Sequence, residues 1–265
     1  MNAPEARVGS TDPRGPRHGW NDSVPLDSSY WAGLLQHEVH LWLFRLDSPP
    51  HPLRSLARLL GEDERRRAAR FVFETDRKRF VAGRGMLRTL LGRYIGVAPE
   101  RVAFEVTAEG KPSVSSVLPE VSIDFNLSHS GGWALLGVTR GRTIGVDIEA
   151  HREMPDAEQI ARSHFSPAEM LEFMAAPSEE RTAAFFACWT RKEAYVKATG
   201  LGLSMRLDRF EVSFRAGDLP RLRSIEGSTM VASEWSLWNC DVGDDMAAAV
   251  VVHGTELSLR QLLLT

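Results

Sequence analysis

Ile144-Gly-Val-Asp-Ile-Glu149 is the stretch around which the rest of this chain is organised. Its apolar residues alternate with Gly145, Asp147 and Glu149, and a period of two predicts a half-buried β-strand. Asp147 and Glu149 then stand side by side on one face, where two like charges raise one pKa unless a cation compensates. Carboxylate oxygens suit a hard cation such as Mg²⁺. Taken alone, the stretch also fits a strand with a solvated acidic face.

A second stretch, Trp189-Thr-Arg-Lys-Glu-Ala-Tyr-Val-Lys197, has a helical period. Trp189, Glu193 and Lys197 are spaced i, i+4, i+8, so they share one stripe of a helix. The flanking residues are apolar, which is not typical of a solvated helix face. A third carboxylate with a lysine one turn away fits a metal–phosphate site, with Glu193 toward the metal and Lys197 toward phosphate. Lys192 is expected on the surface.

A third stretch, Phe125-Asn-Leu-Ser-His-Ser-Gly131, places polar residues at the end of an apolar strand. Ser128 and His129 follow the apolar residues, and Gly131-Gly132 permits a tight turn. A serine–histidine pair at this position fits either phosphate binding or a nucleophile with its base. The sequence lacks a Gly-x-Ser-x-Gly elbow, which favours phosphate binding.

The composition is that of an ordinary globular protein. The chain has 265 residues, of which 43% are hydrophobic and 25% charged. A net charge of −3 argues against nucleic acid or an anionic membrane as a partner. No stretch approaches the ~20 apolar residues of a membrane span. Cys188 and Cys240 provide neither a disulfide framework nor metal-ligand spacing, so a reducing cytoplasm is the expected location.

Periodicity outside these stretches predicts a mixture of strands and helices. Residues 1–28 are rich in Pro, Gly, Arg, Asp and Ser, and are expected to form a flexible tail. Strands are expected at Val39–Leu46, Val102–Val106 and Met246–Val252. Helices are expected at Glu62–Arg70, across Phe80–Tyr94, and through the second stretch to about Thr199.

The second part of the chain repeats features of the first. Phe104-Glu-Val106 recurs as Phe210-Glu-Val212, and Ala134–Thr139 resembles Ala247–Val252. Five further positions match at a constant offset: Phe71, Thr75, Phe80, Val81 and Gly85 against Phe186, Thr190, Tyr195, Val196 and Gly200. Because the order is preserved, we expect an α+β fold of two pseudo-symmetric α/β halves, residues 29–142 and 143–265.

Four motifs, taken in order, resemble those of the Sfp-type 4′-phosphopantetheinyl transferases: Gly110-Lys-Pro112, Phe125–Ser130, Gly145–Glu149 and Trp189–Lys197. The resemblance extends from about Val39 to Phe214. It implies a pseudo-dimeric fold with the active site between the halves, and a monomer, because short family members need an oligomer to complete the same site. It also implies transfer of the 4′-phosphopantetheine arm of coenzyme A to a serine of an apo acyl or peptidyl carrier protein. The reaction would depend on Mg²⁺ and release adenosine 3′,5′-bisphosphate.

The same resemblance implies roles for the side chains of the C-terminal half. Asp147, Glu149 and Glu193 would hold Mg²⁺, and Lys197 would neutralise charge on the pyrophosphate. Glu193 is also the candidate base for the incoming serine, directly or through a water. Glu169 fits either a family acid near the site or an acid in the first turn of a helix.

The N-terminal half would hold the adenosine end of coenzyme A. Lys111 should meet the adenine or its phosphates, and Ser128 and His129 should hold the 3′-phosphate as hydrogen-bond donors. Arg67 and Arg84 are candidates for a further basic contact to phosphate.

Two other classes of protein share part of this pattern. A magnesium-dependent phosphohydrolase could use the same three carboxylates, but it would leave Gly110-Lys-Pro112 and Ser128-His129 unexplained. A non-catalytic module that binds coenzyme A or carrier proteins would not need a metal site. Incubation with coenzyme A, Mg²⁺ and an apo carrier, followed by weighing the carrier, separates the three. Carriers of fatty-acid, polyketide and nonribosomal peptide assembly all fit the pattern.

Leu201 and Leu203 follow the predicted end of the helix at Thr199, on a turn with two glycines. They lie either in the core or on a turn that meets the carrier beside its serine. On the second reading, Leu201→Ser should raise the KM for carrier protein and spare coenzyme A binding. Transfer rates should fall only modestly with added salt, because apolar docking is not electrostatically steered. Steady-state kinetics test both points, and a steep salt dependence or an unfolded variant would contradict them.

Overall fold

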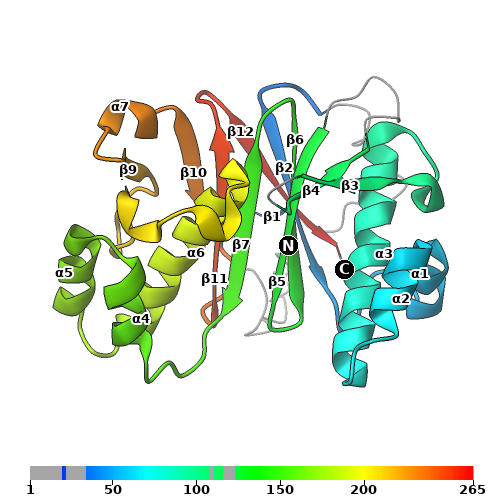
Figure 1. Ribbon diagram of the computed structural model, residues 1–265, viewed down its shortest axis with the longest axis horizontal. Coiled ribbons are helices and arrows are strands. Elements are labelled where there is room, and N and C mark those ends of the chain that lie inside the picture. The colour runs from blue at the N-terminus through cyan, green and yellow to red at the C-terminus, as the bar shows by residue number, and fades with distance from the viewer. Residues whose placement is uncertain (1–19, 22–33, 108–109, 116–122, 265) are drawn as a thin grey trace, which may run out of the picture.

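Two β-sheets lie next to each other at the centre of the molecule (Figure 1). The computed structural model describes residues 20–21, 34–107, 110–115 and 123–264. Within these residues, one sheet has the strand order β1 (Trp20–Asn21), β12 (Ser258–Leu264), β2 (Glu38–Arg45), β6 (Trp133–Arg140), β5 (Ile123–Ser130). The other has the order β10 (Trp235–Asn239), β11 (Met246–His253), β7 (Ile144–Ala150).

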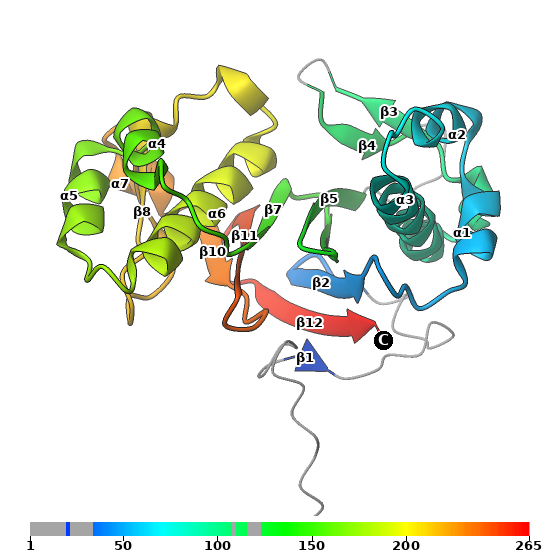
Figure 2. The same ribbon diagram turned by 90° about the horizontal axis from the view of Figure 1, so that it is seen from below.

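Helices cover the outer sides of the sheets, and Figure 2 shows the helices of the two halves on opposite sides of the molecule. The N-terminal half contributes α1 (Leu53–Leu59), α2 (Glu62–Ala68), α3 (Glu74–Ile95) and the short turn η2 (Pro99–Arg101). The C-terminal half contributes α4 (Ala157–His164), α5 (Pro167–Ala175), α6 (Arg181–Thr199), α7 (Thr229–Ala232), η3 (Gly202–Ser204) and η4 (Leu207–Arg209). Among the described residues, no helix combines the length and apolar character needed to cross a membrane.

The two halves have the same order of elements, which confirms the predicted α+β fold. A strand, a long helix, a small hairpin and two further strands occur in each half. The hairpins are β3 (Phe104–Val106) with β4 (Pro112–Val114), and β8 (Phe210–Val212) with β9 (Leu222–Ile225). The pairing order is also the same, β2-β6-β5 in one half and β7-β11-β10 in the other.

The constant offset found in the sequence does not extend to the bounds of the two long helices. Phe71 precedes α3, whereas its counterpart Phe186 lies inside α6. The helices therefore correspond as elements, but not residue by residue.

The last strand crosses between the halves. β12 belongs to the C-terminal half by sequence, yet it pairs in parallel with β2 of the first sheet. Trp20 and Asn21 add β1 in parallel to the other side of β12. The rest of the tail expected at residues 1–28 lies outside the described residues.

Most of the elements expected from periodicity are confirmed, including β2, β7, β11, α2 and α3. The helix expected to end near Thr199 does so, and Gly200 closes it in the left-handed conformation with φ 75°. The strand expected from Val102 begins later, at Phe104, because η2 precedes it and Val102 is buried in the core.

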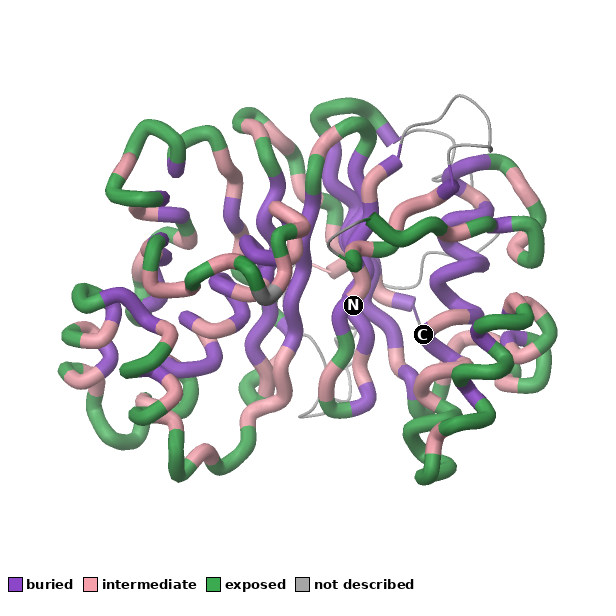
Figure 3. The backbone as a smooth tube through the Cα atoms, in the orientation of Figure 1, coloured by how far each residue is buried: buried purple, intermediate pink, exposed green. Residues whose placement is uncertain are grey.

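Three apolar clusters hold these elements together. One lies between α3 and the first sheet, a second between α6 and the second sheet, and a third between the two sheets. Ile144, Val146 and Ile148 of β7 belong to the third cluster and are fully buried. Figure 3 shows buried residues concentrated along the central strands and α3. Because side chains alternate along a strand, Gly145, Asp147 and Glu149 of β7 face the other way.

Gly145 sets the distance between β7 and α6. A Cβ at this position would overlap the carbonyl oxygen of Ala194 and the backbone nitrogen of Ala198, both on α6. The α6 backbone therefore lies directly against β7, so that Asp147, on the same face of the strand, meets the side chains of that helix.

Gly145→Ala should destabilise the fold by about 3 kcal/mol, because overpacking against backbone atoms has no side chain to move aside. Gly83→Ala is the matched control. Its added methyl would meet only Leu46 Cδ2 at 3.5 Å, within a helix, and should be neutral or stabilising by up to about 1 kcal/mol. Urea unfolding of both variants measures the difference. Equal stability of the two would show that the approach of α6 to β7 is not limited by Gly145.

Candidate active site

Strands β5 and β7 are edge strands of separate sheets, and side chains join them. The Oδ1 atom of Asn126 accepts a hydrogen bond from the backbone nitrogen of Val146 at 2.9 Å. Ser128 Oγ donates to Asp147 Oδ1, also at 2.9 Å. The polar residues of β5 thereby hold Asp147 against the edge of the first sheet.

Ser130 holds Glu149 in the same way. Its Oγ donates to Glu149 Oε2 at 3.0 Å, and Arg152 approaches the same oxygen at 3.3 Å. His129, between the two serines, is exposed, as strand alternation requires for the opposite face of β5. The structure therefore separates the predicted pair: Ser128 meets the carboxylate of Asp147, and His129 faces solvent.

Lys197 connects α6 to the seam, the set of side-chain hydrogen bonds between β5 and β7. Its Nζ lies 2.5 Å from Asp147 Oδ1 and 3.1 Å from Ser128 Oγ. Asp147 is 3% exposed, and its second oxygen, Oδ2, is buried without a hydrogen-bond partner in the described structure. A buried carboxylate oxygen without a donor is an acceptor suited to a cation.

Glu193 lies one turn before Lys197 on the same helical stripe. Burial raises the pKa of Glu193, Asp147 and Glu149 raise it further, and Lys197 lowers it. In the part of the chain that the structure describes, no three His, Cys, Asp or Glu side chains form a ready metal cage. Asp147 and Glu149 thus act on the charge of Glu193, but the three predicted ligands are not gathered at one point.

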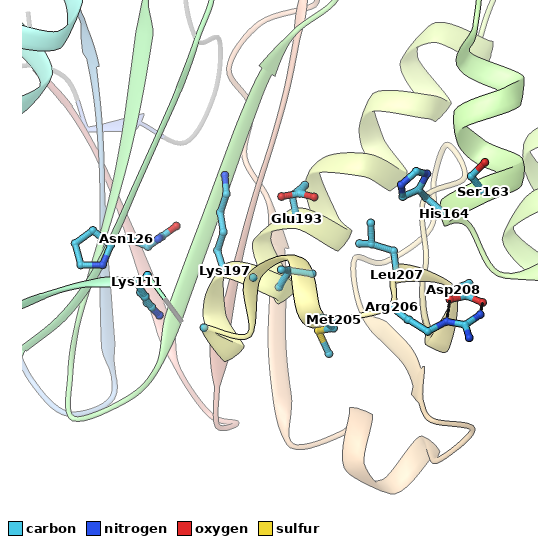
Figure 4. A pocket seen from close by; sticks show the side chains of 15 residues that line it. Lys111, Asn126, Ser163, His164, Glu193, Lys197, Met205, Arg206, Leu207 and Asp208 are labelled. Carbon is cyan, nitrogen blue, oxygen red and sulfur yellow. Dashed lines mark hydrogen bonds and ion pairs between the residues drawn. The ribbon is translucent and has the colours of Figure 1, made fainter. Parts of the chain in front are cut away.

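A cleft of about 570 Å³ opens beside these residues, and both halves line it (Figure 4). In Figure 4, Lys111 and Asn126 lie on one side of Glu193 and Lys197, with His164 on the other. The remaining lining residues follow α6 or flank these positions: Gly110, Pro112, Ser163, Val196, Gly200, Gly202, Met205, Arg206, Leu207 and Asp208.

Lys111 reaches from the N-terminal half to the C-terminal half. Its Nζ donates to the carbonyl oxygens of Ile144 at 2.9 Å and Ala198 at 3.3 Å. A cation at the last turn of α6 also interacts favourably with the helix dipole. Burial lowers the pKa of Lys111, and Asp124 opposes that shift. The predicted coenzyme A contact therefore lies at the cleft, with its ammonium bound to backbone carbonyls.

Neither of the two candidate arginines lines the cleft. Arg84 forms an ion pair with Glu64 at 2.5 Å, and its guanidinium lies 4.4 Å from the ring centre of Phe104. Arg67 is exposed on α2, with its guanidinium 5.3 Å from the ring centre of Phe80.

Lys192 is buried, so the expectation of a surface lysine is wrong. Its side chain and that of Glu169 are both 0% exposed, and they form an ion pair at 2.7 Å. Lys192 Nζ also donates to the carbonyl oxygens of Leu207 at 2.8 Å and Phe210 at 2.6 Å. Glu169 completes a capping box with Ser166, which confirms the helix-terminus reading of this acid. The buried pair holds the segment after α6 that borders the cleft.

Sequence reasoning missed Asn126, Ser130 and His164. Asn126, Ser128 and Ser130 are two residues apart in the third stretch, so the period of two indicates that all three lie on one face of the strand. His164 Nδ1 donates to the carbonyl oxygen of Ile160 at 2.9 Å, and the ring packs edge-on against Trp189. Its place in the cleft depends on tertiary packing that no local pattern encodes.

Leu201 lies on the turn after α6 and is 46% exposed. This exposure favours the turn reading over the core reading for Leu201. The side chain of Leu203 lies outside the described structure.

Glu193→Gln should stabilise the metal-free protein near neutral pH. Because the pKa of Glu193 is raised in the folded state, its carboxylate contributes a stability that is present at low pH and lost as pH rises through that pKa. The gain in stability from Glu193→Gln should therefore vanish at about pH 3, where the Glu193 carboxyl is protonated in both the folded and the unfolded state. Urea unfolding across this pH range measures it, with exposed Glu100→Gln as the control for loss of charge. A gain that does not change with pH would contradict the assignment.

Comparison with known proteins identifies the family. Residues 143–251 match a family described as "4′-phosphopantetheinyl transferase superfamily", and residues 48–140 match "4′-phosphopantetheinyl transferase, N-terminal". The 4′-phosphopantetheinyl transferase HetI of Nostoc sp. is 41% identical over 83% of this chain and 90% of that protein. A phosphopantetheinyl transferase of Thraustochytrium sp. is 33% identical over 82% and 80%, and Sfp of Bacillus subtilis is 31% identical over 58% and 66%. The chain belongs to the 4′-phosphopantetheinyl transferase family, enzymes that use coenzyme A to transfer phosphopantetheine to carrier proteins.

Proposed function

We propose that the cleft between the two halves is where this enzyme joins the arm of coenzyme A to a serine of an apo acyl or peptidyl carrier protein. The observation that carries the proposal is the contact of Lys197 with both Asp147 and Ser128. This contact unites a carboxylate, a cation and a residue of the N-terminal half, and Lys197 carries it to the wall of the cleft. Each of the three belongs to a different sequence motif.

The reaction is a phosphoryl transfer. The serine oxygen of the carrier attacks the β-phosphorus of coenzyme A, and the bond from that phosphorus to the bridging oxygen breaks. Adenosine 3′,5′-bisphosphate leaves, and the serine proton passes to a base. Such a reaction depends on positioning and on neutralising charge rather than on a covalent intermediate with the enzyme.

Asp147, Glu149 and Glu193 would hold Mg²⁺. Asp147 Oδ2, which is buried without a partner in the described structure, supports this role, as does the repulsion of Glu193 by Asp147 and Glu149. Oxygen ligands are those that Mg²⁺ prefers. When bound, Mg²⁺ would neutralise charge on the pyrophosphate. A cation among the three would also offset their repulsion, which the lone Lys197 reduces only in part.

Glu193 and Lys197 would act on the reacting groups. Lys197, at the cleft wall, would stabilise negative charge on the pyrophosphate. Glu193 would accept the serine proton, directly or through a water. Its raised pKa supports this second role, because a base works best when its pKa lies nearer the operating pH.

The N-terminal half would hold the adenosine end of coenzyme A. Lys111 lines the cleft and would exchange its carbonyl contacts for the adenine or its phosphates. His129, exposed near the end of β5, would hold the 3′-phosphate, whereas Ser128 would first have to leave Asp147. Arg67 is exposed and free to reach an outer phosphate, whereas Arg84 would first have to leave Glu64.

The enzyme is proposed to act as a cytoplasmic monomer. A single chain supplies both walls of the cleft, which supports the monomer. Cys188 and Cys240 are both free and buried, as suits a reducing compartment.

Asp147→Ala should lower transfer at least about 100-fold while leaving the fold intact, because it removes a proposed metal ligand from the reacting charge. The assay incubates enzyme, coenzyme A, limiting Mg²⁺ and an apo carrier, and weighs the carrier. Asp47→Ala is the matched control, since Asp47 only pairs with Arg79 at the surface. Near-normal turnover of a folded Asp147→Ala protein would overturn the metal assignment. A wild-type enzyme that leaves the carrier mass unchanged would overturn the proposed reaction.

A further inference from the structure

A second cavity, also of about 570 Å³, lies against the other side of α6. It is bounded by the first part of α6, the turn between β8 and β9, and the segment between β10 and β11. None of its lining residues lines the coenzyme A cleft. Arg191 lines this cavity and Glu193 lines the cleft, and two residues along a helix correspond to about 200° of rotation. The helix that carries the catalytic carboxylate therefore has a separate cavity on its opposite face.

Arg191 is a buried cation that has no counter-ion among the residues the structure describes. Its side chain is 5% exposed, and one terminal nitrogen donates to the carbonyl oxygen of Ser213. The Nε atom is buried and has no hydrogen-bond partner in the described structure. The carboxylate that most favours its charged form is that of Asp218, which instead pairs with Arg223 at 3.0 Å. Among the described residues, no carboxylate lies within ion-pair distance of Arg191.

An unpaired buried guanidinium is unfavourable, because a charge removed from water needs an opposite charge and hydrogen bonds to replace hydration. His151, whose Nε2 is also buried without a partner in the described structure, lines the same cavity. An anion in that space would lie beside a cation that lacks a counter-ion.

The walls around Arg191 determine what kind of anion fits. Ala184, Ala187, Phe214 and Val242 provide an apolar surface with small side chains along α6. Around it stand exposed Arg215, the exposed acids Glu180 and Asp241, and Asp218, which pairs with Arg223. This mixed set of charges disfavours a dianion such as phosphate more than a single negative charge.

We propose that this cavity binds a small aliphatic monocarboxylate, with the carboxylate against the guanidinium of Arg191 and the chain along the alanines of α6. A carboxylate supplies the missing counter-ion for the guanidinium. The apolar chain then covers surface that would otherwise face water. The site is independent of the transfer reaction, so its test does not depend on the proposed function.

Octanoate is a suitable probe, and octan-1-ol has the same chain without the charge. Titration calorimetry on the full-length protein should show saturable binding of one octanoate, with octan-1-ol at least about tenfold weaker. Arg191→Met keeps the buried apolar stem and removes the charge, so it should weaken octanoate at least about tenfold. Arg79→Met, which alters a surface arginine paired with Asp47, should leave the affinity unchanged.

A second variant tests the cavity itself. Ala187→Leu adds a good helix former that fills space beside Arg191, and it should weaken octanoate with the guanidinium intact. It decides the question if Arg191→Met does not fold. Absence of saturable binding to the wild type, equal affinity of Arg191→Met and Arg79→Met, or unchanged affinity in Ala187→Leu would each overturn the proposal. So would loss of binding in Lys111→Met, because octanoate would then occupy the coenzyme A cleft.

Discussion

Side-chain hydrogen bonds from β5 to β7 hold the edges of two separate sheets together, and the geometry of the cleft depends on them. Edge strands carry backbone groups that need partners. Here the amide oxygen of Asn126 satisfies the Val146 nitrogen, which would otherwise be left unpaired at a cost of about 1–3 kcal/mol. Ser128 and Ser130 then donate to the carboxylates of Asp147 and Glu149 on β7. A period of two on each strand thus sets the register of one half against the other.

The seam links stability to chemistry, because its residues are also those proposed to act. Ser128 and Lys197 both contact Oδ1 of Asp147, which leaves Oδ2 as the atom without a partner. Burial raises the pKa of Glu193, the charges of Asp147 and Glu149 raise it further, and Lys197 offsets these effects only in part. Electrostatic repulsion therefore remains in the metal-free protein. A cation that binds the folded state alone would stabilise it by mass action, so metal binding and folding should be linked.

Local patterns in the sequence predicted the elements and their repetition, but not the contacts made by distant segments. The alternation in β7 and the glycine after Thr199 are local signals, and both were interpreted correctly. The crossing of β12 to β2 joins opposite ends of the chain, so no periodicity could indicate it. Lys192 was misplaced for the same reason, since Glu169 and the carbonyl of Phe210 meet it only in the folded protein. By contrast, strand alternation already implied that neighbours in β5 face opposite ways.

α6 shows how one helix serves two sides of the C-terminal half. Four of its cations are at least partly buried, and the structure treats them differently. Arg181, in the first turn, donates to the carbonyl oxygens of Ala176 and Met174. Lys197 meets the carboxylate of Asp147 at the cleft. Lys192 has Glu169 and two backbone carbonyls, enough to use all three of its donors. Arg191 has a carbonyl from Ser213 and, among the described residues, no carboxylate. The two lysines are neutralised by acids of the chain itself, whereas the counter-ion proposed for Arg191 is an anion from outside the chain.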